Sequence, residues 1–166
     1  MYVDAYHTGD QKLRQLRSRF IIYLNLAPIV WMSKKQATVE TSVFGAKFVA
    51  MKLGMETLQG LWFKLQMMGI PVAGPSSVYG DNMYVIRNTQ RPESTLKKKP
   101  NSVCYHAVRE SVAMGKMRTA YVSSNENRAD ICTKIILGCQ NQQNLVRKSC
   151  MTFMTTVIPS PTRAEW

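Results

Sequence analysis

The feature that most constrains this chain is a long stretch, 40–68, whose apolar residues repeat with the period of an α-helix. The repeat runs at steps of three and four residues and consists of Phe44, Phe48, Met51, Met55, Leu58, Trp62 and Leu65. This spacing is typical of an amphipathic helix that packs one face on a core. Thr41 and Ser42 can cap the start of the helix, and Gly69 followed by Pro71 can end it. We therefore expect one long helix against which the rest of the chain folds.

Lys47 occupies an unusual place on this helix. At about 100° of rotation per residue, its side chain falls at the edge of the apolar stripe and not on the opposite, solvated face. The sequence therefore predicts an ammonium group near the buried side of the helix.

Length and composition favour one folded domain. A chain of 166 residues with 45% hydrophobic residues can bury a sizeable core. We expect the domain to span residues 1–138 and residues 139–166, rich in Gln, Asn and Pro towards the end, to form a poorly ordered tail.

No targeting or membrane signal is evident in the sequence. No apolar run approaches the roughly 18 residues that a membrane span needs. Residues 1–10 are polar and contain Asp4, where a signal peptide needs a basic start and an apolar block. The four cysteines lack a Cys-x-x-Cys pair, which favours free thiols in a reducing compartment over a zinc site. We expect an intracellular protein, cytoplasmic or nuclear and not secreted.

Several shorter segments flank the long helix. We expect the end of a strand at 2–6, a hairpin from Phe20 to Trp31 broken at Ala27-Pro28, and further strands at 77–79 and 119–122. Helices are expected at 83–88 and 102–114, followed by a polar turn into a helix at 125–134. This order predicts a mixed α/β fold, in which helices cover a sheet.

Three carboxylates stand near the predicted strand ends. Asp4 ends the first strand, Asp81 ends the fourth, and Asp130 opens the last helix. In such sheets, acids from several strand ends can converge and supply the hard oxygen ligands that Mg²⁺ prefers. Solvated acids at turns and helix starts are the commoner arrangement, and the spacing alone leaves both alternatives open.

Four motifs, in order and spacing, resemble a known family. They are Trp31-Met32-Ser33-Lys34-Lys35-Gln36-Ala37-Thr38-Val39, Tyr79-Gly80-Asp81-Asn82, Tyr105-His106-Ala107-Val108-Arg109-Glu110 and Ala129-Asp130-Ile131-Cys132-Thr133-Lys134. Together they are similar to the ribonuclease H domain of the copia-type retrotransposon Pol polyprotein, over about residues 3–138.

The resemblance implies a ribonuclease H-like fold, a five-stranded mixed sheet flanked by helices. Active members of this family cut the RNA strand of an RNA–DNA hybrid with two Mg²⁺ ions about 4 Å apart, held by four carboxylates. Carried over by motif, the catalytic and metal-binding acids are Asp4, Asp81 and Asp130. The second acid of the family is a Glu on the long helix, and Lys47 stands in its place.

This substitution predicts loss of catalysis. An ammonium beside two divalent cations replaces attraction by repulsion, and one unit-charge contact at 4 Å is worth about 4 kcal/mol at an effective dielectric constant of 20. A structural interpretation of Lys47 is that its ammonium pairs with Asp4 or Asp81 and replaces the metal as counter-charge. Both interpretations predict a pseudoenzyme with weak or lost Mg²⁺ binding.

The truncated first strand favours a degenerate remnant of a retrotransposon, since only residues 1–3 precede Asp4. Cys132 and Tyr84 also differ from the usual family motif, and Cys132 is expected to be a core thiol. Tyr84 is expected to crowd the metal pocket.

The basic residues leave nucleic-acid binding open as an alternative. The chain carries 22 Lys and Arg against 10 acids, a formal net charge of +12, which favours a polyanionic partner. An RNA–DNA hybrid or another nucleic acid could be bound without catalysis by Lys34, Lys35, Lys97, Lys98, Lys99 and Arg109, with Tyr79 or Trp31 nearby. The sequence is equally compatible with a solvated basic loop that binds nothing. Two other interpretations stay open, a working ribonuclease H in which Asp4, Asp81 and Asp130 bind metal without a fourth acid, and an unstable fragment that has no selected role.

Overall fold

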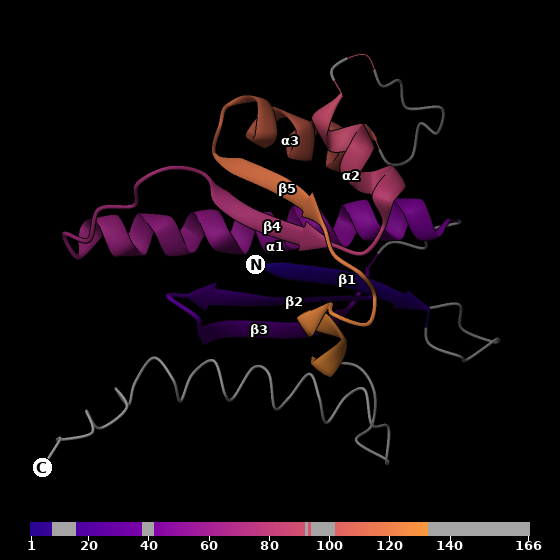
Figure 1. The fold of residues 1–166 in the computed structure, drawn as a ribbon, viewed down its shortest axis with the longest axis horizontal. Coiled ribbons are helices and arrows are strands. Elements are labelled where there is room, and N and C mark those ends of the chain that lie inside the picture. The colour runs from indigo at the N-terminus through magenta and orange to yellow at the C-terminus, as the bar shows by residue number, and fades with distance from the viewer. Residues whose placement is uncertain (8–15, 38–41, 92, 94–101, 133–166) are drawn as a thin grey trace, which may run out of the picture.

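The structure is a computed structural model that describes residues 1–7, 16–37, 42–91, 93 and 102–132. It contains a five-stranded sheet in the order β3-β2-β1-β4-β5 (Figure 1). The strands are β1 (Tyr2–His7), β2 (Leu16–Leu24), β3 (Ala27–Lys35), β4 (Ser76–Gly80) and β5 (Met117–Tyr121). The first three strands are antiparallel neighbours, whereas β4 runs parallel to both β1 and β5. The expected mixed α/β fold is confirmed.

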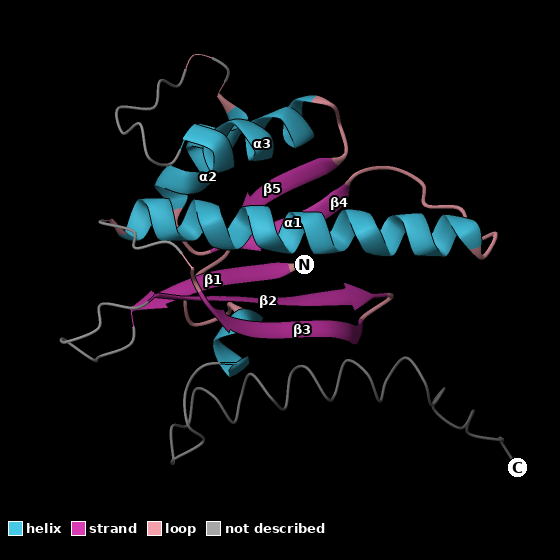
Figure 2. Cartoon of the chain, turned by 180° about the vertical axis from the view of Figure 1, so that it is seen from behind, coloured by secondary structure: helices cyan, strands magenta, loops and turns pink. Residues whose placement is uncertain are grey.

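The helices lie mainly on one face of this sheet. They are α1 (Val43–Met67), α2 (Met83–Gln90) and α3 (Ser102–Ala113), and Figure 2 shows α1 crossing in front of the strands. A short 3-10 helix, η2 (Arg128–Cys132), lies on the opposite face. The core forms between α1 and the sheet, where Phe20, Phe48 and Val78 are almost fully buried. The predicted tail, 139–166, lies outside the described residues.

The long helix begins and ends close to the expected residues. Ser42 is the N-cap, and its hydroxyl accepts a hydrogen bond from the amide of Gly45 at 3.2 Å. Beyond the last turn, Gly69 has a positive φ of 75°, a conformation that glycine adopts without steric cost. Residues 40 and 41 lie outside the described residues. The local capping chemistry therefore fixes both ends of α1.

The hairpin differs from expectation. The chain turns at Asn25 and Leu26, which have φ values of 46° and 73°, and Ala27-Pro28 begins β3 instead of breaking it. Proline is tolerated at the start of a strand at the sheet edge, because its missing N–H is not needed there. The turn was missed because Leu26 is not a residue type that favours positive φ.

The first strand extends past Asp4 as far as His7, so Asp4 lies within the strand and not at its end. Near its start, the Met1 ammonium donates to the Ser77 carbonyl at 2.8 Å, and the Tyr79 amide donates to the Met1 carbonyl at 2.8 Å. These bonds join β1 to β4. The central position of β1 places Asp4 in the middle of the molecule.

Candidate functional site

Asp4 and Asp81 meet where β1 and β4 run side by side. Asp4 lies in β1 and is only 6% exposed. Asp81 follows β4 directly, after Gly80, which pairs with Val3 of β1. Neighbouring parallel strands are about 4.8 Å apart, so these two positions bring their carboxylates into one pocket.

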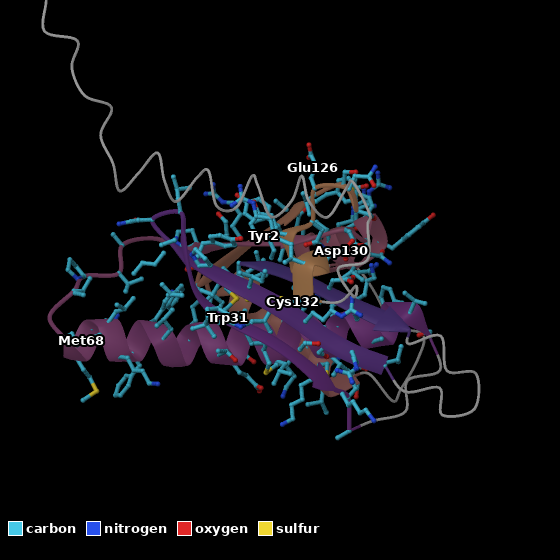
Figure 3. All side chains as sticks on the ribbon, turned by 90° about the horizontal axis from the view of Figure 1, so that it is seen from below. Tyr2, Trp31, Met68, Glu126, Asp130 and Cys132 are labelled. Carbon is cyan, nitrogen blue, oxygen red and sulfur yellow. The ribbon has the colours of Figure 1, made fainter. Side chains whose placement is uncertain are left out.

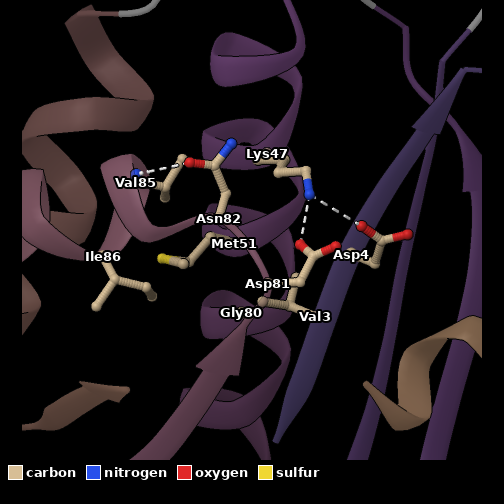
Figure 4. A pocket seen from close by; sticks show the side chains of 9 residues that line it. All are labelled: Val3, Asp4, Lys47, Met51, Gly80, Asp81, Asn82, Val85 and Ile86. Carbon is tan, nitrogen blue, oxygen red and sulfur yellow. Dashed lines mark hydrogen bonds and ion pairs between the residues drawn. The ribbon is translucent and has the colours of Figure 1, made fainter. Parts of the chain in front are cut away.

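Lys47 projects from the first turns of α1 into the same pocket. Its ammonium donates a hydrogen bond to Asp81 Oδ1 and lies 3.5 Å from Asp4 Oδ1 (Figure 4). Only 15% of its side chain is exposed. The pairing that the sequence suggested for Lys47 is therefore present, and it involves both acids.

Arg19 is a second cation at this site that sequence reasoning missed. It lies in β2 directly opposite Asp4, and its Nη1 is 3.6 Å from Asp4 Oδ2. The side chain is 2% exposed. Arg19 directly precedes the apolar run 20–22, which is typical of a buried strand. Because buried charges are almost always paired, this position indicates that Arg19 has an acidic partner. Two carboxylates and two cations give this cluster a formal charge of zero.

Asp81 has a further hydrogen-bond partner besides Lys47, and the residue after it caps α2. The Ser124 hydroxyl donates to Asp81 Oδ2 at 3.3 Å. The next residue, Asn82, caps α2, since its side-chain oxygen accepts from the amides of Tyr84 and Val85. Tyr84 itself is 73% exposed and does not line the pocket, so the expected crowding by Tyr84 is wrong. The first turn of α2 directs this side chain to solvent.

Asp130 is not part of the same pocket. It lies on η2, which packs on the face of the sheet opposite α1, and it is labelled in Figure 3. In the described part of the chain, no three His, Cys, Asp or Glu side chains are grouped so that they could hold a metal ion. The structure thus brings Asp4 and Asp81 together and does not add Asp130 to form a group of three.

The position of η2 depends on Asn127, which is fully buried. Its amide Nδ2 donates to the Val3 carbonyl at 3.1 Å, and its Oδ1 accepts from the Ala129 amide at 3.1 Å. Arg128 lies over the Tyr2 and Tyr23 rings, 5.4 and 5.1 Å from their centroids. Sequence reasoning assigned no role to Asn127 or Arg128.

Cys132, at the end of η2, has its thiol pKa raised by burial, with the positive charge of Arg19 acting in the opposite direction. A raised pKa keeps the thiol protonated at neutral pH, and the thiol is not the nucleophilic form. This residue therefore adds no reactive group to the site.

The pocket does not fit the pair of Mg²⁺ ions that the resemblance implies. Its volume is about 10 Å³, about the smallest that can hold one water molecule. Magnesium is octahedral at about 2.1 Å and usually keeps several waters, which the space between Asp4 and Asp81 does not provide while the Lys47 ammonium occupies it. An ammonium has no lone pair with which to ligate a metal.

The predicted nucleic-acid-binding residues that the structure describes lie on different elements. Lys34 and Lys35 are exposed at the end of β3 and line a cleft beside α1. Arg109 instead donates to the Tyr105 hydroxyl and the Arg91 carbonyl, both at 2.9 Å. Lys97, Lys98 and Lys99 lie outside the described residues.

The two aromatic residues named with them also differ in exposure. Trp31 is 67% exposed. Tyr79 is half-buried and stacks on Tyr2, with 4.9 Å between the ring centroids. Only Trp31 therefore offers a largely free ring.

Comparison with protein-family models gives no match. The chain is similar to curated retrovirus-related Pol polyproteins from plant transposons. It is 31% identical to that of transposon RE2 and 30% identical to that of RE1, both from Arabidopsis thaliana, over 133 residues or 80% of this chain. It is 30% identical over 138 residues, 81% of this chain, to that of transposon TNT 1-94 from Nicotiana tabacum. The matches span only 9 to 10% of the length of these relatives.

The fold is similar to that of a solved structure, LC11-RNase H1 isolated from compost. The TM-score is 0.57 at 19% identity, covering 78% of this chain and 87% of that one. The ribonuclease H-like fold expected from the four motifs is thus confirmed. None of the described helices is both long and apolar enough to cross a membrane.

Proposed function

We propose that this chain, which is related in sequence to a segment of retrotransposon Pol polyproteins and has a ribonuclease H-like fold, is a catalytically inactive remnant of a ribonuclease H. The observation that carries the proposal is the ion pairing of Lys47 with Asp4 and Asp81. The ammonium supplies the positive charge that a metal ion would otherwise supply between these acids.

Electrostatics support the loss of metal binding. A unit charge 4 Å away is worth about 4 kcal/mol at an effective dielectric constant of 20. Since each 1.4 kcal/mol changes affinity about tenfold, exchanging a ligand for a repulsive ammonium lowers metal occupancy by several orders of magnitude. Arg19 adds a second positive charge 3.6 Å from Asp4. The chemistry of this site therefore favours a closed internal salt bridge over two-metal hydrolysis.

Incubation of the purified chain with a labelled RNA–DNA hybrid and Mg²⁺ tests the proposal. We expect no cleavage above that of an Asp81→Asn variant, which controls for contaminating nucleases. Cleavage by the unaltered chain that Asp81→Asn abolishes would show that Lys47 does not prevent catalysis.

Binding of nucleic acid without catalysis is a second candidate function, favoured by the exposed pair Lys34 and Lys35 and by the net charge of +12. Phosphate contacts need positive charge and no metal site. Their binding constant falls with salt, with a logarithmic slope of about 0.7 to 0.9 per phosphate neutralised.

A salt titration of hybrid and single-stranded oligonucleotide binding measures this contribution. Replacing both Lys34 and Lys35 by Ala is expected to lower the salt slope by about 2, close to 1 for each lysine. The matched control is Lys64→Ala, an exposed lysine at the other end of α1. Equal slopes for the double variant and the unaltered chain would exclude the β3 lysines as phosphate contacts.

A further inference from the structure

β3 forms one edge of the sheet. In the described part of the chain it pairs with β2 on one side and with no strand on the other. A nine-residue edge strand presents backbone N–H and C=O groups that can pair with another strand. Trp31, near its middle, is 67% exposed. Among the residues that the structure describes, this edge is therefore an available interaction surface.

The register identifies which backbone groups face outward. The Gln36 amide donates to the Leu16 carbonyl of β2 at 2.8 Å. Along an antiparallel strand, the backbone N–H and C=O groups of successive residues point alternately to one side of the strand and to the other. The register of β3 with β2 is regular from Lys35 to Val30. The N–H and C=O groups of Lys34 and Met32 therefore point towards β2, and those of Ser33 and Trp31 point away from the sheet.

We infer that β3 pairs with β3 of a second copy of this chain, antiparallel, about a two-fold axis at Trp31. Because the axis passes between the two Trp31 residues, their outward groups exchange both backbone hydrogen bonds. The two indole rings then lie on the same face of a continuous ten-stranded sheet, where cross-strand aromatic pairs are favourable.

The positions of the lysines along β3 favour this register of the two copies. Proline and lysine usually protect strand edges from pairing, but in β3 they lie near opposite ends and leave 29–33 uncharged. With the axis at Trp31, Lys34 lies opposite Pro28 and Lys35 opposite Ala27. An axis at Ser33 would instead bring the two Lys34 side chains to diagonal positions about 7 Å apart. The axis at Trp31 thus keeps the lysines of the two copies away from one another.

The net charge of each copy makes this association distinguishable from nucleic-acid binding. Two chains of charge +12 repel one another, and salt screens that repulsion. Self-association should therefore strengthen as salt rises, whereas phosphate binding weakens.

Sedimentation equilibrium of the full, nucleic-acid-free chain tests the inference. We expect the average mass to rise with concentration towards twice the monomer mass, and more so at higher salt. Trp31→Lys, which places two ammonium groups face to face, should weaken association at least tenfold. The control Phe63→Lys changes an aromatic residue of similar exposure, 63%, on α1 and should have no effect. A monomer at every concentration, or equal association of Trp31→Lys and the unaltered chain, would overturn the inference.

Cysteine cross-linking tests the register separately. Trp31→Cys places two thiols on residues about 5.5 Å apart at Cα, a distance that a disulfide spans. In Ser33→Cys the two thiols are offset by four residues, about 14 Å along the strand. Mild oxidation followed by peptide mapping should give a 31–31 link and no 33–33 link. A 33–33 link that forms as readily as the 31–31 link would overturn the proposed axis.

Discussion

At the scale of single residues, Lys47 is bound by two acids that are themselves largely buried. Replacing Lys47 by Met keeps the length of the side chain and removes its charge. Removing one partner of a buried ion pair costs about 3 to 5 kcal/mol. Because Arg19 still compensates Asp4, we expect a smaller loss, about 2 to 3 kcal/mol, measured as a lower midpoint of urea unfolding.

Lys52 on the same helix provides the matched control. Its ammonium is 2.6 Å from Glu56 in an i,i+4 pair whose Glu56 side chain is 51% exposed. Such pairs contribute about 0.5 kcal/mol or less, so Lys52→Met should change stability little. Equal losses for the two variants would contradict the special role of Lys47.

Introducing an acid at position 47 should create a response to metal. In Lys47→Glu, three carboxylates share the pocket without a nearby ammonium, and their repulsion destabilises the fold in the absence of metal. A cation that binds only the folded state raises the melting temperature. We expect millimolar Mg²⁺ to raise the melting temperature of Lys47→Glu and to leave that of the unaltered chain unchanged. Equal shifts in both proteins would argue against Lys47 as the obstacle to metal binding.

At the scale of secondary-structure elements, η2 is attached to the sheet by Asn127. Asn127→Ala removes its bond to the Val3 carbonyl and leaves that buried acceptor unsatisfied, a loss of about 1 to 3 kcal/mol. Asn127→Asp should cost more, because a buried carboxylate would then face a carbonyl oxygen. Hydrogen exchange should accelerate in 128–132 before it changes in α1. Uniform acceleration throughout the domain would show that η2 is not a separate unit.

At the scale of the whole molecule, the amino group of Met1 couples stability to pH. Burial lowers its pKa from 8.0 to about 6 in a chain that begins at this residue. Between these values the unfolded chain binds more protons than the folded one, so the free energy of unfolding rises as pH rises from 6 to 8. The upper limit is about 3 kcal/mol.

N-terminal acetylation isolates this effect, because an acetylated chain has no amine to titrate. Urea unfolding of both forms at pH 6 and pH 8 should show the additional stabilisation only in the free chain. The same pH dependence in the acetylated chain would assign it to other groups.

Much of the fold follows from local sequence signals. The apolar period, Ser42 and Gly69 predicted α1 to within three residues at its start and one at its end. The strands at 77–79 and 119–122 were also recognised from short apolar runs. The hairpin turn was misplaced, because Asn25 and Leu26 adopt positive φ through their place between two paired strands and not through their own preference.

The sequence by itself predicted the ribonuclease H-like fold and placed a lysine at position 47, where the family that it resembles has a glutamate. Only the tertiary structure decided how that charge is accommodated. Asp4 and Arg19 are 15 residues apart in sequence, and Lys47 and Asp81 are 34 apart. Their ion pairs exist because strand pairing and the packing of α1 bring these positions together. Helical period and strand alternation specify which face a side chain takes, but the partner on that face depends on the register between distant elements.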